Sequence, residues 1–320
     1  MFSVIITLYN KTLYIEKCLR SVLDQTCQDF EVIVVNDGST DDGAEKAEKF
    51  KVQSSKFKVI SQLNTGVSTA RNNGVKAAKF DYIAFLDADD WWEPTFLEEM
   101  KGMIEEYPQA GIYGSSYYLI KNSRKRIAPI GVEPSFHKGI INYCRVYAKT
   151  LCMPLWTCAV IVPIKALKSE NGFKPILKLG EDFDLWIRIV LKYPVVFLNK
   201  PLANYNQDVD LAYRAVGNLH NPENHVLWNL EYLANEELSD PDLKQLLDNL
   251  RVYGLFPYFL TGEYRRLAKQ ELDKVDWKNQ PVTARRRYSR PVFLLKIESR
   301  FFWFGSKIKQ FLLRNLLQNI

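Results

Sequence analysis

The first ninety residues alternate between short apolar runs and segments whose apolar residues recur at helical spacing. The runs are rich in β-branched and aromatic residues, which predicts strands at 2–7, 31–35, 57–60 and 81–86. Between them, Ile15, Leu19 and Val22 mark one helix face, and 66–78 predicts a helix of small residues. This alternation predicts right-handed βαβ units, hence an α/β fold with a mostly parallel central sheet flanked by helices.

Polar residues follow three of these strands, so they meet at the carboxyl edge of the predicted sheet. They are Tyr9, Asp37 and the pair Asp87 and Asp89. Ligands of open α/β sheets bind at this edge. Two carboxylates one residue apart suit Mg²⁺ or Mn²⁺, which also takes oxygens from a phosphate. We therefore predict a metal–diphosphate site, with the alternative that acids here only cap a helix beginning near Pro94.

Composition places the chain among ordinary globular proteins, with 320 residues, 47% hydrophobic and 25% charged, and a net charge of +6. The five cysteines lack a C-x-x-C pair, which argues against a disulfide framework or a zinc site and favours a cytoplasmic setting. We expect neither a signal peptide nor a membrane span. The loops after the strands contain no G-x-G-x-x-G or P-loop sequence, which disfavours dinucleotide oxidoreductases and P-loop proteins.

Four segments in this order resemble the family-2 glycosyltransferases that have a GT-A fold. They are SVIITLYN at 3–10, VVNDGSTD at 34–41, NTGVSTARN at 64–72 and FLDADD at 85–90. The resemblance spans roughly the first two hundred residues. It implies an inverting transferase that uses a nucleotide-sugar donor, most often a UDP-sugar, together with a divalent metal.

The resemblance also implies roles for residues on the donor side. Thr7 and Tyr9 would line the base pocket, with Tyr9 stacking on the base, and Asp37 would hydrogen-bond the uracil or ribose edge. As an alternative, Asp37 is an ordinary turn residue.

Three further residues would contact the rest of the donor. Arg71 would hold it with an always-charged guanidinium, Asp87 would contact the ribose or a sugar hydroxyl, and Asp89 would bind the metal on the diphosphate. The alternative for Arg71 is a solvated charge on a helix.

The segment LGEDFDLWIR at 179–188 predicts the start of a helix with Glu181 and Asp182 in its first turn. It resembles the Glu-Asp motif of the family, which implies that Asp182 is the catalytic base. Acids there also complement the helix dipole, which is the alternative. Glu181 and Trp186 are candidates for the acceptor site, although core packing explains Trp186 equally well.

We predict a GT-A domain at 1–215, divided into a nucleotide-sugar half (1–115) and an acceptor half (116–215), and a helical C-terminal region at 216–320. Prolines predict an irregular segment over 128–157. Basic and aromatic residues from 285 to 314 predict either a helix at the inner membrane surface or a helix packed on its own domain. No nucleic-acid partner is expected, because a recognised module is missing.

The sequence therefore predicts a glycosyltransferase acting on a glycan or lipid-linked acceptor. The alternative from another class is a non-catalytic nucleotide-sugar or membrane-surface binding module with the same fold.

Overall fold

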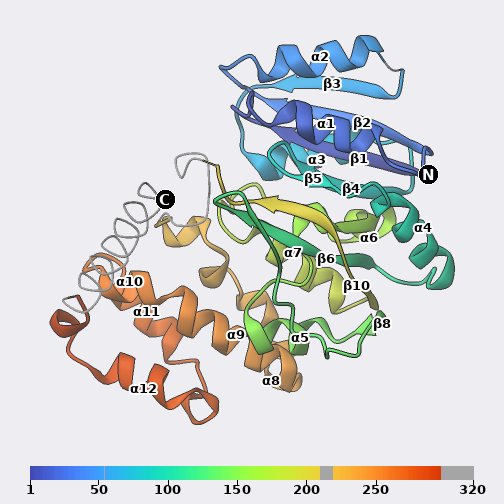
Figure 1. Ribbon diagram of the computed structural model, residues 1–320. Helices are drawn as coiled ribbons and strands as arrows, with labels where there is room; N and C mark the ends of the chain where they lie inside the picture. Colours follow the sequence, from blue (N-terminus) through green and yellow to red (C-terminus); the bar gives the residue numbers. More distant parts are fainter. Residues whose placement is uncertain (54, 210–218, 297–320) are drawn as a thin grey trace, which may run out of the picture. The chain divides into compact units, whose positions relative to one another are not determined.

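The computed structural model describes residues 1–53, 55–209 and 219–296 (Figure 1). The chain divides into two compact units, Met1–Leu243 and Lys244–Ile320. The domain boundary predicted after residue 215 lies outside the described residues, as does the part of the basic, aromatic tail beyond residue 296.

A ten-stranded mixed sheet, counted over the described residues, forms the centre of the first unit. The strand order is β3-β2-β1-β4-β9-β6-β10-β5, with β7 beside β6 and β8 beside β10. The strands are β1 (Phe2–Leu8), β2 (Phe30–Asp37), β3 (Phe57–Gln62), β4 (Tyr82–Asp87), β5 (Trp91–Trp92), β6 (Ile112–Lys121), β7 (Arg124–Ile127), β8 (Lys138–Ile141), β9 (Val160–Pro163) and β10 (Val195–Asn206). Strands β1 to β4 are parallel, and β9 is antiparallel to β4 and β6, so the predicted α/β class is confirmed.

Helices connect and cover these strands (Figure 1). They are α1 (Ile15–Leu23), α2 (Gly43–Gln53), α3 (Val67–Ala77), α4 (Phe96–Glu106), α5 (Tyr143–Thr150), α6 (Ile164–Ser169), α7 (Glu181–Val190) and α8 (Ala234–Ser239), followed across the unit boundary by α9 (Pro241–Gly254). The second unit continues with α10 (Phe256–Leu260), α11 (Arg265–Leu272) and α12 (Val282–Ser289). No helix among the described residues is both long and apolar enough to cross a bilayer.

Alternate residues of β1 pack under different helices. Val4, Ile6 and Leu8 share a buried cluster with the apolar side chains of α1. Ile5 points the other way, against α3, where a Cβ on Gly74 would lie 2.4 Å from the Ile5 side chain. Glycine at this position therefore lets α3 approach the sheet closely, and the strand is buried on both faces as predicted.

The irregular segment predicted at 128–157 is partly wrong. It contains β8 and α5, and α5 buries Tyr143, Cys144, Val146 and Tyr147. The Asn142 side chain caps this helix by accepting a hydrogen bond from the backbone N–H of Arg145 at 2.9 Å. The three prolines lie outside the two elements, so they limit these elements without preventing them.

Candidate active site

Asp87, the last residue of β4, is held by two neighbours at the carboxyl edge of the sheet. Thr7 Oγ1 donates to Asp87 Oδ1 at 2.8 Å, and Arg71 Nη2 donates to both carboxylate oxygens at 3.0 and 3.2 Å. Burial opposes the charged form, but the Arg71 charge and these hydrogen bonds outweigh it and lower the pKa of Asp87. Asp87 is therefore a fixed carboxylate, and the Thr7 hydroxyl is directed to it.

Arg71 on α3 connects this carboxylate to a second helix. Its Nη1 donates to Glu181 Oε1, at the start of α7, at 2.9 Å. The residue is only 3% exposed, and although burial disfavours its charge, Asp87 and Glu181 raise the pKa of the guanidinium. Arg71 is thus a buried cation between two acids, and the alternative of a solvated helix charge is wrong.

The helix predicted at Glu181 begins there, directly after Gly180, which has a φ of +81°. A Cβ on Gly180 would lie 2.3 Å from Val226. Asp182 Oδ2 accepts a hydrogen bond from Thr157 Oγ1 at 3.3 Å, and Oδ1 accepts one from its neighbour's backbone N–H at 2.7 Å. Asp182 is therefore oriented by its own chain.

Burial controls the titration of both acids at the start of α7. It raises the pKa of Glu181 to about 7, with the Asp182 charge adding to the effect. Burial also raises the pKa of Asp182, against the opposing Arg71 charge. A carboxylate with a raised pKa is suited to proton transfer near neutral pH.

Asp89 lies just beyond the end of β4, after Asp87, and pairs with Lys11. Lys11 Nζ lies 2.6 Å from Asp89 Oδ2, and both side chains are largely buried. Burial raises the pKa of Asp89 in spite of the Lys11 charge. Burial and the charges of Asp89 and Asp87 also hold the pKa of Asp90 well above its usual range. The negative charge of Asp87, Asp89 and Asp90 together therefore exceeds the single positive charge of Lys11.

The donor atoms here fit a hard divalent cation. Five acids and two cations belong to this edge of the sheet: Asp87, Asp89, Asp90, Glu181 and Asp182 with Lys11 and Arg71. Within the described ranges, no group of three or more His, Cys, Asp or Glu side chains is arranged to hold a metal. Mg²⁺ commonly uses one or two carboxylates and completes its shell with phosphate oxygens and water. Asp89 is the candidate for such a partial site, but Lys11 occupies its Oδ2, so a metal there would share the carboxylate with Lys11 or displace it.

The residues predicted for the base pocket lie at the ends of β1 and β2. Tyr9 is 40% exposed, so its ring is accessible for stacking. Asp37 is 4% exposed and fixes the loop before α3, accepting from the backbone N–H groups of Thr65 and Gly66 at 2.9 Å each and from Gln62 Nε2 at 2.8 Å. Thr65 Oγ1 also donates to Oδ1 at 3.5 Å, so that oxygen is fully used, whereas Oδ2 accepts only from Gly66 and has room for one more donor.

A pocket of about 460 Å³ opens beside Asp89. Lys17, Trp91, Lys125 and Asn206 contribute to its lining, and Lys17 Nζ lies 3.0 Å from the centroid of the Trp91 ring. The volume is within the roughly 300–1,000 Å³ typical of ligand sites. An aromatic ring and ammonium groups beside a carboxylate suit a polar ligand with hydroxyl or phosphate oxygens.

Trp186 has no exposed surface and packs against Phe85 and Phe173, with ring centroids 6.3 and 5.8 Å away. The predicted contact with an acceptor is therefore wrong for this side chain. Trp186 is a residue of α7 whose ring packs against Phe85 of β4, so the core-packing alternative holds.

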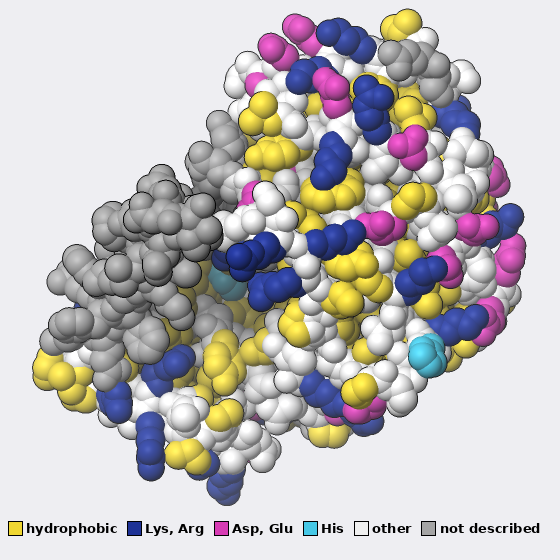
Figure 2. Space-filling model, in the orientation of Figure 1, with side chains coloured by type: hydrophobic (Ala, Val, Ile, Leu, Met, Phe, Trp, Pro, Cys, Tyr) yellow, Lys and Arg dark blue, Asp and Glu magenta, His cyan; other side chains and the backbone are white. Residues whose placement is uncertain are grey.

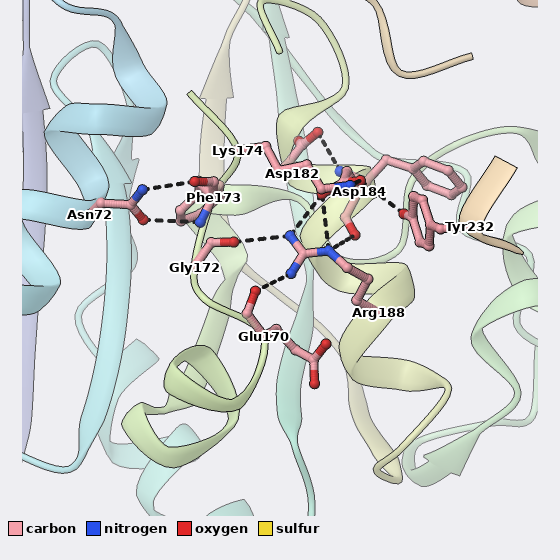
Figure 3. Close-up of polar contacts among 10 residues, drawn as sticks. Asn72, Glu170, Gly172, Phe173, Lys174, Asp182, Asp184, Arg188 and Tyr232 are labelled. Atoms are coloured by element: carbon pink, nitrogen blue, oxygen red, sulfur yellow. Dashed lines mark hydrogen bonds and ion pairs between the residues drawn. The ribbon is translucent and has the colours of Figure 1, made fainter. Parts of the chain in front are cut away.

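Asp184 and Arg188 of α7 form a buried polar network with neighbouring segments (Figure 3). Asp184, fully buried, accepts hydrogen bonds from Arg188 Nη2 and Lys174 Nζ at 2.7 Å and from the Tyr232 hydroxyl at 2.8 Å. Arg188 also donates to the backbone carbonyls of Glu170 and Gly172. This network fixes α7 against the loop that precedes it, and so fixes the position of Asp182.

Sequence reasoning missed Lys11, Thr157 and the Asp184–Arg188 pair. The spacing of Asp184 and Arg188, four residues apart on a helix, was a signal for a pair, although it does not reveal burial. Lys11 and Thr157 gave no such signal, because their partners are 78 and 25 residues away.

Known proteins resemble this chain in sequence and in fold. The model of the family described as "Glycosyl transferase family 2" matches residues 3–155. The uncharacterised glycosyltransferase YibD of Escherichia coli is 40% identical over 273 residues, covering 83% of this chain and 78% of YibD. The chain belongs to glycosyl transferase family 2. Glycosyltransferase GlyA of Streptococcus pneumoniae is 32% identical over 209 residues, which is 63% of this chain.

The family-2 chain also resembles solved structures. Its fold matches that of Staphylococcus aureus TarS residues 1–349 in complex with UDP-GlcNAc, with a TM-score of 0.70 and 23% identity over 85% of this chain and 80% of the TarS chain. This likeness shows a GT-A fold, as the resemblance implied. Several curated relatives are much longer than the matched region, which covers 30% of GlyA and 28% of the putative glycosyltransferase EpsH of Bacillus subtilis.

Proposed function

We propose that this family-2 chain is a metal-dependent inverting glycosyltransferase. It transfers a hexosyl or N-acetylhexosaminyl group from a nucleotide-sugar, by preference a UDP-sugar, to a hydroxyl of a glycan or lipid-linked acceptor. The observation that carries the proposal is the buried Arg71, which joins Asp87 on the donor side to Glu181, the neighbour of Asp182. Family membership and the binding of UDP-GlcNAc by TarS support this assignment.

Asp182 is the general base of the proposed reaction. A sugar hydroxyl is a weak nucleophile, and a positioned carboxylate that takes its proton typically contributes about 10²–10⁴-fold to the rate. Thr157 and the backbone of α7 hold the carboxylate in place. Attack on C1 from the face opposite the nucleotide inverts the anomeric centre through an oxocarbenium-like transition state.

The donor side of the proposed site binds and orients the nucleotide-sugar. Tyr9 stacks on the base, Asp37 accepts a hydrogen bond from the uracil or ribose edge, and Asp87 accepts one from a ribose or sugar hydroxyl. Asp89 would hold Mg²⁺ or Mn²⁺, and the ion would neutralise the charge of the leaving diphosphate. Arg71 keeps Asp87 ionised in this arrangement.

We further propose that the enzyme acts in the cytoplasm on the inner face of the membrane, where a lipid-linked acceptor is accessible. The basic and apolar composition of residues 285–320 supports this location.

Replacing Asp182 by Asn tests the proposal, because Asn keeps the shape and loses the base. The assay measures UDP release from UDP-glucose, UDP-galactose and UDP-N-acetylglucosamine with a panel of simple glycosides as acceptors. We expect D182N to lower transfer by about 10²–10⁴-fold. UDP affinity, measured by calorimetry, should stay near that of the unaltered chain, as should transfer by the control D24N, whose side chain is exposed after α1.

Transfer by D182N at the unaltered rate would exclude Asp182 as the base. UDP binding without transfer from any donor, in the unaltered chain as well, would favour the non-catalytic binding module.

A further inference from the structure

The second unit holds a positive charge that the rest of the chain lacks. Residues 244–296 contain twelve Lys and Arg and five Asp and Glu, a net charge of +7 against +6 for the whole chain. In Figure 2, Lys and Arg side chains, with hydrophobic ones among them, lie over this unit. The remainder of the protein is therefore close to neutral, and the charge is concentrated on α9 to α12.

Part of this charge surrounds a pocket of about 650 Å³ within the unit. Arg265 and Lys269 of α11 and Arg285 of α12 contribute to its lining, as does one acid, Asp273. Its apolar part is an aromatic cluster in which the Tyr288 ring lies 4.9 Å from Phe259 and 5.3 Å from Trp277, centroid to centroid. The pocket thus combines several cations with an apolar floor.

The acids of the unit are mostly engaged elsewhere. Asp248 pairs with Lys244, and Glu271 pairs with Lys274 and, at 3.5 Å, with Arg251. In the described part of the chain, no acidic side chain forms an ion pair with Arg265, Lys269 or Arg285. Three cations and one acid, Asp273, around one cavity leave an excess of positive charge, which favours an anionic ligand with several oxygens, such as a phosphoryl group.

We propose that this pocket binds the phosphoryl headgroup of an anionic lipid. Exposed apolar side chains accompany the basic ones in the same unit, with Val282, Phe293 and Leu294 exposed by 52%, 63% and 41%. The sequence that follows, 297–320, contains four Lys and Arg, one Glu and many Phe and Leu residues. Basic residues match the charged headgroup of an anionic lipid, and apolar residues match its acyl chains. A soluble phosphate would need only the basic residues.

The test measures co-sedimentation of the full chain with vesicles of phosphatidylcholine, alone or with phosphatidylglycerol or a polyprenyl phosphate added at equal charge. We expect binding only to the two anionic vesicles. The pocket variant R265Q/K269Q/R285Q should bind them about 100-fold more weakly, since each basic residue near an anionic surface contributes roughly fivefold. Stronger binding to polyprenyl phosphate would identify an acceptor lipid, and equal binding would identify the bulk membrane.

The matched control R266Q/K278Q/R286Q removes the same charges from exposed positions of the same unit that do not line the pocket. We expect it to bind vesicles at least tenfold more tightly than the pocket variant. Because Arg265 Nε also donates to the Phe259 carbonyl, the double variant K269Q/R285Q repeats the test without changing that contact.

Equal weakening by the pocket and control variants would overturn the proposal, because it would show a diffuse charge effect. Binding of inorganic pyrophosphate in calorimetry without binding of any vesicle would overturn the lipid assignment. The proposal does not depend on the transfer reaction, since UDP release with soluble glycosides tests that reaction without lipid.

Discussion

Glu181 and Asp182 are adjacent acids that share one buried environment and one cation. Burial raises the pKa of both, and Arg71 compensates for only part of their charge because it also pairs with Asp87. Two nearby carboxylates lose their protons in coupled steps, so the first ionisation makes the second harder. The charge of each acid therefore affects the ionisation of the other, and the two titrate as a pair.

We predict that transfer increases with pH as this pair ionises, with the last step near the Glu181 pKa of about 7. E181Q should move the acid limb of kcat/KM to lower pH, because a neutral neighbour makes Asp182 easier to ionise. Gln keeps the oxygen that accepts from Arg71 Nη1. A pH–rate profile of E181Q checks this prediction, with E105Q, a change at an exposed position of α4, as the control. An acid limb of E181Q at the same pH as in the unaltered chain would contradict the prediction.

Helix α7 positions the proposed base, and the Asp184–Arg188 pair anchors the helix. Asp184 is fully buried, and the Arg188 side chain is 13% exposed, so neither group is fully solvated by water. Arg188 satisfies Asp184 and the carbonyls of two residues in the preceding loop. Removing the cation would leave a buried carboxylate with fewer partners, which is costlier than losing a surface pair.

We predict that R188M lowers the free energy of unfolding by about 3–5 kcal/mol, the usual cost of breaking a buried ion pair. The control is R145M, which breaks the pair of Arg145 with Asp242, where the arginine side chain is 64% exposed. Such an exposed pair contributes little to stability, so R145M should have a much smaller effect than R188M. Urea unfolding of both variants gives the comparison, and equal effects would contradict the anchoring role.

Periodicity predicted the elements whose burial pattern is regular. Strands β1, β2 and β4 are almost entirely buried because helices cover both faces, and their long apolar runs made them recognisable, whereas the edge strand β3 is partly exposed. In α5, the spacing of Tyr143, Val146 and Tyr147 is helical, but nearby prolines outweighed it in the prediction. The role of Trp186 was ambiguous in the sequence. An aromatic residue on an amphipathic helix has the same spacing whether it packs in the core or contacts a ligand.

At the scale of the whole molecule, the fold brings distant segments to one edge of the sheet. Lys11, Arg71 and Asp87 come together because β1, β3 and β4 are parallel strands with a common carboxyl edge, and α7 brings Glu181 to the same edge from a separate part of the chain. The alternation of strands and helices was sufficient to predict that edge, and the ion pairs across it could not be predicted without coordinates.

We propose that this edge is a metal–diphosphate site for a nucleotide. Calorimetric titration of UDP, GDP, dTDP and CMP, each with and without Mn²⁺, tests the claim most directly. We predict metal-dependent binding of one nucleotide, with UDP favoured. D89N should weaken this binding by at least about tenfold, and D24N should leave it unchanged. Failure of the unaltered chain to bind any of the four nucleotides with Mn²⁺ would contradict the account.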